Sequence, residues 1–407
     1  MRLHIGGLYW PEVTSLPEIR LAKDAADLHK EILVVGGGIS GAISAYRLAK
    51  AGHPVSLIEE NTIASGSSAA NTGLIQYMSD QGLDEFIDQI GKEKAVRFYD
   101  QSIEAVSTLV SINEDLDKLD EETFELRDSL ILATEEDKIQ TLKDEVEAQE
   151  DQDYAATYES TADLKEDDVD AYAGMRIEGD IALNPYGFVH QLIQKAIDEY
   201  DLKVLEHTRF VDLESSEEGH LVRLETEEGE EEAVFDRILF ATGYNPLDFL
   251  KPYLTKLQVN KTYVTVSQKD ISLDEEKDFL VWEMKDPYTY FRETFDGRLM
   301  VGGMDKEDDQ LQEEDVRLHD DDLVEQTKDM IQLDDFKFEP EYSYAALFGE
   351  SKDGIPYMGT VPGDDKLFVI CAAGGNGTIY STIGSEMALL WAKGEDLSDY
   401  DIYQLNR

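Results

Sequence analysis

The stretch from Lys30 to Glu60, KEILVVGGGISGAISAYRLAKAGHPVSLIEE, constrains the fold more than any other part of the chain. It opens with the apolar, mostly β-branched run Ile32–Val35, which is typical of a buried parallel strand. Three glycines follow at G-x-G-x-x-G spacing: Gly36, Gly38 and Gly41. The first permits a tight turn, the second lets backbone approach a pyrophosphate, and the third allows close helix–strand packing. The spacing therefore predicts a dinucleotide site at a helix N-terminus.

A helix and a second strand complete this βαβ unit. Alanine and leucine recur at helical spacing up to Gly52, which suits a helix C-cap, and Val55–Ile58 is again an apolar strand. Glu59 ends that strand, where an acid accepts hydrogen bonds from a ribose, and Glu60 is interpreted as its solvated neighbour. The alternative is an ordinary βαβ turn without a ligand. The pattern alone does not separate FAD from NAD.

The charge of the chain argues against several kinds of partner. Its 407 residues, enough for two or three domains, carry 89 acidic and 36 basic side chains, a formal net charge of −53. Such a field repels nucleic acid and anionic membranes. We interpret the acids as a solvated surface, and adaptation to high salt is a plausible cause. Calcium binding would require an alternating D-x-D-x-D-G loop, which the sequence lacks.

Cysteine content and hydropathy add expectations about chemistry and location. Cys371 is the one cysteine, so no intrachain disulfide and no cysteine-based cluster or zinc site is expected. No metal-binding residues are predicted. No apolar run reaches the ~18 residues of a membrane span, and the N-terminus lacks the layout of a signal peptide. We expect a soluble cytoplasmic protein whose N-terminal arm, with Tyr9 and Trp10, packs onto the body.

Two further segments rich in small residues point to the same site. NTIASGSSAANTGL follows Glu60 directly, and its glycines and short polar side chains let backbone approach a ligand closely. Near the C-terminus, Gly374, Gly375 and Gly377 precede a helix that begins near Thr378, which repeats the order of strand, glycine turn and helix N-terminus. We expect one site built from both ends of the chain, with the middle inserted as a second domain.

This order of features resembles the D-amino-acid-oxidase/glycine-oxidase (DAO) superfamily of FAD-dependent oxidoreductases over nearly the whole chain. The resemblance rests on the βαβ stretch above and on the segments SGSSAANTGL, ILFATGYNP and DGIPYMG…AAGGNGTIYS. Within the superfamily the chain is most similar to bacterial members with a G-G-N-G ending. It is more distantly similar to γ-glutamylputrescine oxidoreductases, which the Tyr9-Trp10 arm also fits.

The resemblance implies an α/β fold with two domains. A Rossmann-like FAD-binding domain would be assembled from a discontinuous chain, residues 1–85, 184–250 and 345–407. An α+β substrate domain with a mixed or antiparallel sheet would take residues 86–183 and 251–344. The same resemblance implies non-covalent FAD, because Ala69 and Ala70 stand where some relatives carry a tethering histidine, and Ala345, Ala346 and Leu347 where others carry a cysteine.

Roles at the FAD site also follow from the resemblance. Five residues would hold the pyrophosphate: Gly36, Gly38, Ile39, Ser40 and Gly41. Glu59, with Glu60 beside it, would bind the adenosine ribose. One segment would pass along the ribityl chain: Ser65, Gly66, Ser67, Ser68, Asn71, Thr72, Gly73 and Leu74. Val211, on a strand expected from Val204 to Leu213, would meet the adenine. Ala241, Thr242 and Gly243 would cover the nucleotide. Gly375, Asn376, Gly377 and Thr378 would lie at the pyrimidine edge of the flavin.

The resemblance leaves the substrate open. Relatives that bind an α-carboxylate use basic side chains at places aligned with Gln76, Gly375 and Ile379, so simple α-amino-acid oxidation is in doubt. Three functions stay possible: dehydrogenation of a C–N bond of an amine or amino-acid-like substrate by hydride transfer to flavin N5, oxidation of a hydroxy acid or polyol, and a non-catalytic flavin-binding redox sensor. The electron acceptor is not indicated.

A predicted hairpin supplies the candidate residues on the substrate side. Residues 288–302 read as two strands around Asp296-Gly297, and period two groups Tyr288, Tyr290 and Arg292 on one face. An arginine beside aromatic rings can clamp a carboxylate, so we take Arg292 and Tyr290 as candidates for binding a remote carboxylate. The alternative is that Arg292 pairs with an acid of the protein.

Overall fold

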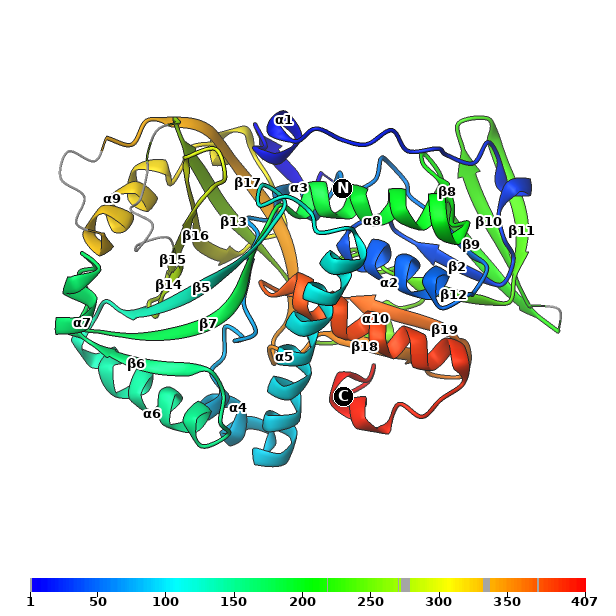
Figure 1. Ribbon diagram of the computed structural model, residues 1–407. Helices are drawn as coiled ribbons and strands as arrows, with labels where there is room; N and C mark the ends of the chain where they lie inside the picture. Colours follow the sequence, from blue (N-terminus) through cyan, green and yellow to red (C-terminus); the bar gives the residue numbers. More distant parts are fainter. Residues whose placement is uncertain (1, 218, 270, 272–278, 332–336, 372) are drawn as a thin grey trace.

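The computed structural model describes residues 2–217, 219–269, 271, 279–331, 337–371 and 373–407. A ten-stranded sheet forms one half of the molecule and a six-stranded sheet forms the other (Figure 1). The long helix α5 (Lys92–Asp115) runs between the halves and packs on α10 (Gly377–Lys393). This is the α/β fold with a second sheet domain that the sequence predicts.

The six-stranded sheet has the order β18-β19-β12-β2-β3-β8. Its strands β19, β12, β2, β3 and β8 are parallel, and β18 runs antiparallel to β19. The bounds are β2 Ile32–Val35, β3 Val55–Ile58, β8 Lys203–Leu205, β12 Arg237–Phe240, β18 Tyr357–Val361 and β19 Asp364–Cys371. β2 and β3 have the bounds that the sequence predicts, because each is a short apolar run between turn residues.

Both faces of this sheet are covered, which explains why its strands are apolar throughout. Ile32 and Val34 pack toward helices α2 (Ile39–Lys50), α8 (Pro185–Tyr200) and α10. Leu33 and Val35 pack toward a three-stranded antiparallel sheet. Its order is β11-β10-β9, with bounds β9 Arg209–Ser216, β10 Gly219–Thr226 and β11 Gly229–Phe235.

The ten-stranded sheet has the order β1-β17-β13-β16-β15-β14-β5-β7-β4, and β6 also pairs with β7. It is mixed, because β14 and β5 are parallel whereas the other neighbours are antiparallel. The bounds are β1 His4–Gly6, β4 Leu74–Ile75, β5 Phe124–Ala133, β6 Ala156–Ser160, β7 Ala173–Leu183, β13 Leu257–Ser267, β14 Leu280–Glu283, β15 Thr289–Glu293, β16 Leu299–Glu307 and β17 Pro340–Ser351.

The remaining α-helices lie around the two sheets, some of them against the ten-stranded sheet (Figure 1). They are α1 Trp10–Val13, α3 Ser67–Ala70, α4 Leu83–Ile90, α6 Ile139–Glu150, α7 Thr161–Glu166 and α9 Asp320–Met330. Short 3-10 helices cover Ala25–Asp27, Glu136–Lys138, Lys251–Tyr253, Glu313–Asp315 and Ser398–Tyr403. Among the described helices, none is long and apolar enough to cross a membrane.

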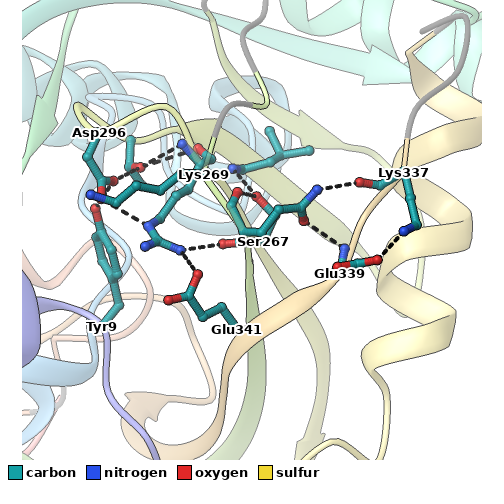
Figure 2. A network of polar contacts seen from close by, with 11 residues as sticks. Tyr9, Ser267, Lys269, Asp296, Lys337, Glu339 and Glu341 are labelled. Atoms are coloured by element: carbon teal, nitrogen blue, oxygen red, sulfur yellow. Dashed lines mark hydrogen bonds and ion pairs between the residues drawn. The ribbon is translucent and has the colours of Figure 1, made fainter.

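The N-terminal arm packs onto the body, with Tyr9 and Trp10 fully buried. The Tyr9 hydroxyl donates to Asp296 Oδ1 at 2.5 Å, and Asp296 Oδ2 accepts from Arg298 Nε at 2.9 Å. Arg298 also donates to Glu341 and to the carbonyl oxygen of Ser267 (Figure 2). The arm is therefore fastened to the turn between β15 and β16, the hairpin that the sequence predicts.

The division of the chain into domains stays a prediction. Residues 1–85 and 345–407, assigned to the FAD-binding part, also supply β1, β4 and the second half of β17 to the ten-stranded sheet.

Candidate functional site

A cavity of about 740 Å³ is lined by residues of both large sheets. The six-stranded half contributes the turn after β2, the segment after β3 and the residues that follow β12. The ten-stranded half contributes Thr262, Trp282, Tyr288, Tyr290 and Asp305. Because the carboxyl ends of parallel strands meet at one sheet edge, the glycine-rich turn after β2 and the residues after β12 lie side by side there.

The turn after β2 brings helix α2 against this cavity. Gly36 has φ +111°, and a Cβ there would lie 2.4 Å from the carbonyl oxygen of Ala241. A Cβ on Gly41 would lie 1.9 Å from the carbonyl oxygen of Gly36, so this glycine serves helix packing and does not line the cavity. Gly38 is the N-cap of α2 and makes no side-chain cap. Gly36, Gly38, Ile39 and Ser40 line the cavity, and the helix dipole favours an anion there.

Glu59 lies at the end of β3 and lines the same cavity, as does the exposed Glu60. The carboxylate of Glu59 accepts hydrogen bonds from the backbone N–H groups of Gly37, at 2.7 Å, and Asn61, at 2.8 Å. Burial raises the pKa of Glu59. The two backbone bonds fix the carboxylate at the place where the spacing predicts a ribose ligand.

The segment after β3 runs along the cavity, as the sequence predicts. Seven of its predicted residues line it: Ser65, Gly66, Ser67, Ser68, Asn71, Thr72 and Leu74. Ser68 Oγ accepts from the N–H of Ile39 at 2.9 Å, which joins this segment to the start of α2. Trp10 Nε1 donates to the carbonyl oxygen of Asn71 at 2.7 Å, so the N-terminal arm holds the segment from outside. Gly73 lies behind the cavity wall.

Arg292 does not lie where the hairpin pattern suggests. Tyr290 lines the cavity, but Arg292 does not. The Arg292 side chain is buried, and its Nη1 donates to the carbonyl oxygens of Gly73 and Leu183, each at 2.9 Å. The predicted contact of Arg292 with the substrate is therefore not supported by this geometry, which favours a bracing role for Arg292 behind the cavity wall.

The C-terminal glycine turn closes another part of the cavity. Gly375, Asn376, Gly377 and Thr378 line it at the N-terminus of α10, and the side chain of the N-cap residue Asn376 does not accept a hydrogen bond from the first turn of the helix. Asn376 Nδ2 donates to the carbonyl oxygen of Met78 at 2.5 Å. The N-termini of α2 and α10 thus both border one space, which the sequence indicates through two glycine turns.

Residues after β12 and at the start of β9 complete the nucleotide end. Ala241, Thr242 and Gly243 line the cavity as predicted, and Tyr244, Asn245 and Leu247 extend that wall. Val211 is 43% exposed and is not among the lining residues; Thr208, Arg209 and Phe210 are. The expected strand from Val204 to Leu213 is divided at His207, which has φ +51°, so Val211 belongs to the three-stranded sheet.

The other end of the cavity combines aromatic rings with carboxylates. The Tyr288 hydroxyl donates to Asp305 Oδ2 at 2.5 Å, and the ring of Tyr288 lies 6.1 Å from those of Trp282 and Tyr290. The Asp80 side chain is exposed within the cavity, but protein surrounds it. The resulting loss of solvation, followed by the charges of Glu350 and Asp305, raises the pKa of Asp80 to about 7. Burial also raises the pKa of Asp305 to about 6.

Asp80, Trp282 and Asp305 are absent from the sequence-based candidates. Asp80 lies between short elements with no periodic pattern, and Asp305 lies within β16 beside a register shift in its pairing with β13. No local motif indicates either one. Within the described residues, no group of histidine, cysteine and acidic side chains is arranged to hold a metal ion.

The fold and the two glycine turns define a dinucleotide-dependent oxidoreductase. Residues 31–390 match the DAO family, described as FAD-dependent oxidoreductases, and the chain belongs to this family. Its cofactor is FAD. The glycine turns fit such a group, because on the cavity side a Cβ at Gly38 would meet only Ser68 Oγ, at 3.2 Å, and a Cβ at Gly243 would meet nothing within 4 Å.

Individual proteins are similar to the chain over different shares of its length. Glycine oxidase of Bacillus subtilis (strain 168) is 24% identical over 357 residues, 86% of this chain and 89% of that protein. The crystal structure of glycine oxidase from Geobacillus kaustophilus superposes with a TM-score of 0.76 at 18% identity, over 93% of this chain and 98% of that one. A Rieske 2Fe-2S iron–sulfur protein of Bacillus subtilis (strain 168) is 31% identical over 140 residues, 34% of this chain, which spans only 27% of that relative.

Proposed function

We propose that the protein dehydrogenates a C–N bond of a small amine or amino-acid-like substrate. The observation that carries the proposal is one continuous cavity. It joins the dinucleotide turn at Gly36 to an end where Tyr288, Tyr290 and Asp305 can receive a small polar molecule. A glycine oxidase, by its name, acts on a molecule with a C–N bond, and similarity to two such enzymes supports the same class of reaction here.

The residues named above would divide the work between holding the cofactor and holding the substrate. Gly36, Gly38, Ile39 and Ser40 would hold the pyrophosphate, and Glu59 the ribose. FAD, when bound, supplies the acceptor for a hydride. The α C–H bond of a neutral amine breaks with both of its electrons, the nitrogen lone pair forms the C=N bond, and water hydrolyses the resulting iminium. Side chains of the protein orient the substrate and exclude water from it.

We propose further that FAD is held without a covalent bond. Ala69 and Ala70 are buried in α3, and their methyl side chains carry no nucleophilic atom that could bond to the flavin. Acid precipitation of the yellow holoenzyme tests this point. All of the flavin should remain in the supernatant, and flavin left on the precipitated protein would contradict it.

Anaerobic bleaching of the flavin by a panel of compounds tests the reaction class. Amines or N-substituted amino acids should reduce the flavin, whereas hydroxy acids and polyols of the same size should not. Bleaching by hydroxy acids alone would assign the cavity to alcohol oxidation. No bleaching by any compound, with dithionite as the positive control, would favour a flavin-binding protein without this activity.

A further inference from the structure

Resting on the proposed function, we infer that the substrate is an amine with a second ammonium group, a diamine or polyamine, and not one with a carboxylate. The inference comes from the charges, unpartnered oxygens and aromatic rings at the end of the cavity away from the dinucleotide turn. We call this end the acidic pocket and define it by Asp80, Thr262, Trp282, Tyr288 and Asp305.

Asp305 presents a carboxylate oxygen that the protein leaves without a good hydrogen bond. Its Oδ2 accepts from the Tyr288 hydroxyl, but its Oδ1 is buried and makes no hydrogen bond of good geometry within the described residues. The same holds for Oγ1 of Thr262, a residue only 9% exposed that lines the cavity beside it. Buried acceptors without partners are costly, and a bound N–H donor would satisfy them.

Asp80 and Glu350 add negative charge on either side of the C-terminal glycine turn. Asp80 Oδ2 lies 3.0 Å from the place of a Cβ on Gly375, and Glu350 Cβ lies 3.6 Å from that of Gly374. Glu350 lines a second pocket of about 140 Å³ that shares Asp80 with the main cavity, and it accepts from Gln258 and Asn260, each at 2.5 Å. Asp80 and Glu350 both line this second pocket, and loss of solvation, followed by the charge of Glu350, raises the pKa of Asp80.

No described basic side chain balances these acids within the acidic pocket. Among the described residues that line the main cavity, the basic ones are His4 and Arg209. His4 contacts the carbonyl oxygen of Ser65, and Arg209 pairs with Glu225 at the nucleotide end. Lys352 lines the second pocket and is exposed to solvent. A substrate carboxylate in the acidic pocket would be repelled, whereas a cation would be attracted.

The aromatic rings suit the same cation. Trp282, Tyr288 and Tyr290 present neighbouring rings, and an ammonium within about 6 Å of such ring faces is stabilised by their quadrupoles. Tyr290 can lie flat in the wall because its cross-strand partner is Gly302, where a Cβ would lie 2.4 Å from the ring. Rings and carboxylates together favour a charged alkylammonium over a neutral amine.

A matched set of compounds isolates the distal group. On the FAD holoenzyme under anaerobic conditions, 1,4-diaminobutane, butylamine and 4-aminobutanoate share a chain length and differ only at one end; the corresponding eight-carbon set covers a longer reach. The concentration for half-maximal flavin bleaching should be about tenfold or more lower for the diamine than for the monoamine, since a buried charge pair is lost in the latter. The amino acid should be the weakest of each set.

Variants assign this preference to the acidic pocket. Asp305→Asn and Asp80→Asn should each raise the half-maximal concentration of the diamine relative to that of the monoamine, so that the two values come close together. Glu307→Gln removes the same charge from an exposed position on the same strand as Asp305, and should leave the diamine preference intact. Binding is read independently of turnover from the perturbation of the flavin absorbance and from the melting temperature.

The outcomes separate this inference from the proposed function. If no amine bleaches the flavin but the diamine perturbs its spectrum in a way that Asp305→Asn abolishes, the inference stands and the proposed reaction fails. If 4-aminobutanoate bleaches best, or if diamine and monoamine behave alike in both readouts, the inference is overturned and the proposed reaction stands. No bleaching and no spectral perturbation by any of these compounds would overturn both.

Discussion

Arg292 Nη1 donates a hydrogen bond to the carbonyl oxygen of Gly73 at a distance of 2.9 Å. Gly73 has φ +76°, and a Cβ there would lie 1.8 Å from the carbonyl oxygen of Leu183 and 2.9 Å from the guanidinium. The guanidinium therefore fills the space behind the segment that lines the nucleotide cavity. It donates to the carbonyl oxygens of Gly73, just before β4, and Leu183, at the end of β7.

Replacing Arg292 with Met should weaken both folding and FAD binding. The variant leaves buried carbonyl groups without a charged donor, which costs on the order of 2–4 kcal/mol. Urea unfolding of the apoprotein and fluorimetric titration with FAD measure the two losses. If Arg292→Met kept wild-type stability and FAD affinity and only raised the KM for amines, Arg292 would instead belong to the substrate site.

Gly38→Ala should reduce FAD affinity while leaving the fold intact. The added methyl group would meet only the Ser68 hydroxyl, at 3.2 Å, but it would occupy the space at the N-terminus of α2 where we place the pyrophosphate. We expect at least about a tenfold loss of affinity, or about 1.4 kcal/mol, with the melting temperature of the apoprotein nearly unchanged.

Gly41→Ala is the matched control for that variant. Its methyl group would lie 1.9 Å from the carbonyl oxygen of Gly36, so this substitution should destabilise the apoprotein itself. Equal FAD affinity in wild type and Gly38→Ala would mean that the pyrophosphate does not approach this turn.

Asp80 should make the protein less stable as pH rises. Its side chain is open to the cavity but surrounded by protein, and the loss of solvation, with the charges of Glu350 and Asp305, raises its pKa to about 7 in the folded state. The folded state therefore binds this proton more tightly than the unfolded state does. The stability that the protonated Asp80 contributes is lost as pH rises from the ordinary carboxyl pKa to about 7.

The variant Asp80→Asn should therefore melt about 1–3 °C above wild type near pH 8, and the two should converge near pH 4. Differential scanning calorimetry without substrate gives both values, and Glu307→Gln corrects for the change in net charge. A variant that melts below wild type near pH 8 would show that the Asp80 carboxylate is stabilised in the folded protein.

Salt should raise the melting temperature. A net charge of −53 implies strong repulsion within the folded chain. Raising KCl from about 0.05 to about 1 M shortens the Debye length several-fold and screens this repulsion. Thermal unfolding followed by circular dichroism measures the effect, with sucrose of equal osmolality as the control. A melting temperature that stays constant or falls as KCl rises would show that charge repulsion does not limit the stability of the folded protein.

Local signals predicted the nucleotide half of the fold well. The apolar runs of β2 and β3, the glycine spacing and Glu59 lie within one stretch of chain, and each has its own physical cause there. The second glycine turn, at Gly375 and Gly377, is equally local. Such features need no knowledge of distant pairing.

Features that depend on distant pairing could not be predicted in the same way. The alternation of side chains along β15 places Tyr290 and Arg292 on one face of the strand. Gly73 and Leu183 cover Arg292 on that face, whereas Tyr290 is left open to the cavity. Asp80 and Asp305 come together through the pairing of strands far apart in the chain, and a register shift between β13 and β16 affects where Asp305 points. Positive φ at His207 redirects Val211, and no residue pattern announces that turn.

Isotopic substitution at the carbon beside the amine nitrogen tests C–N oxidation most directly. The rate of anaerobic flavin bleaching should be compared for an amine that reduces the flavin and for the same amine with deuterium on that carbon. We expect the deuterated compound to bleach the flavin several times more slowly, because the C–H bond breaks in the step that reduces the flavin. Bleaching by a hydroxy acid with its own isotope effect, while no amine reduces the flavin, would contradict the proposed function.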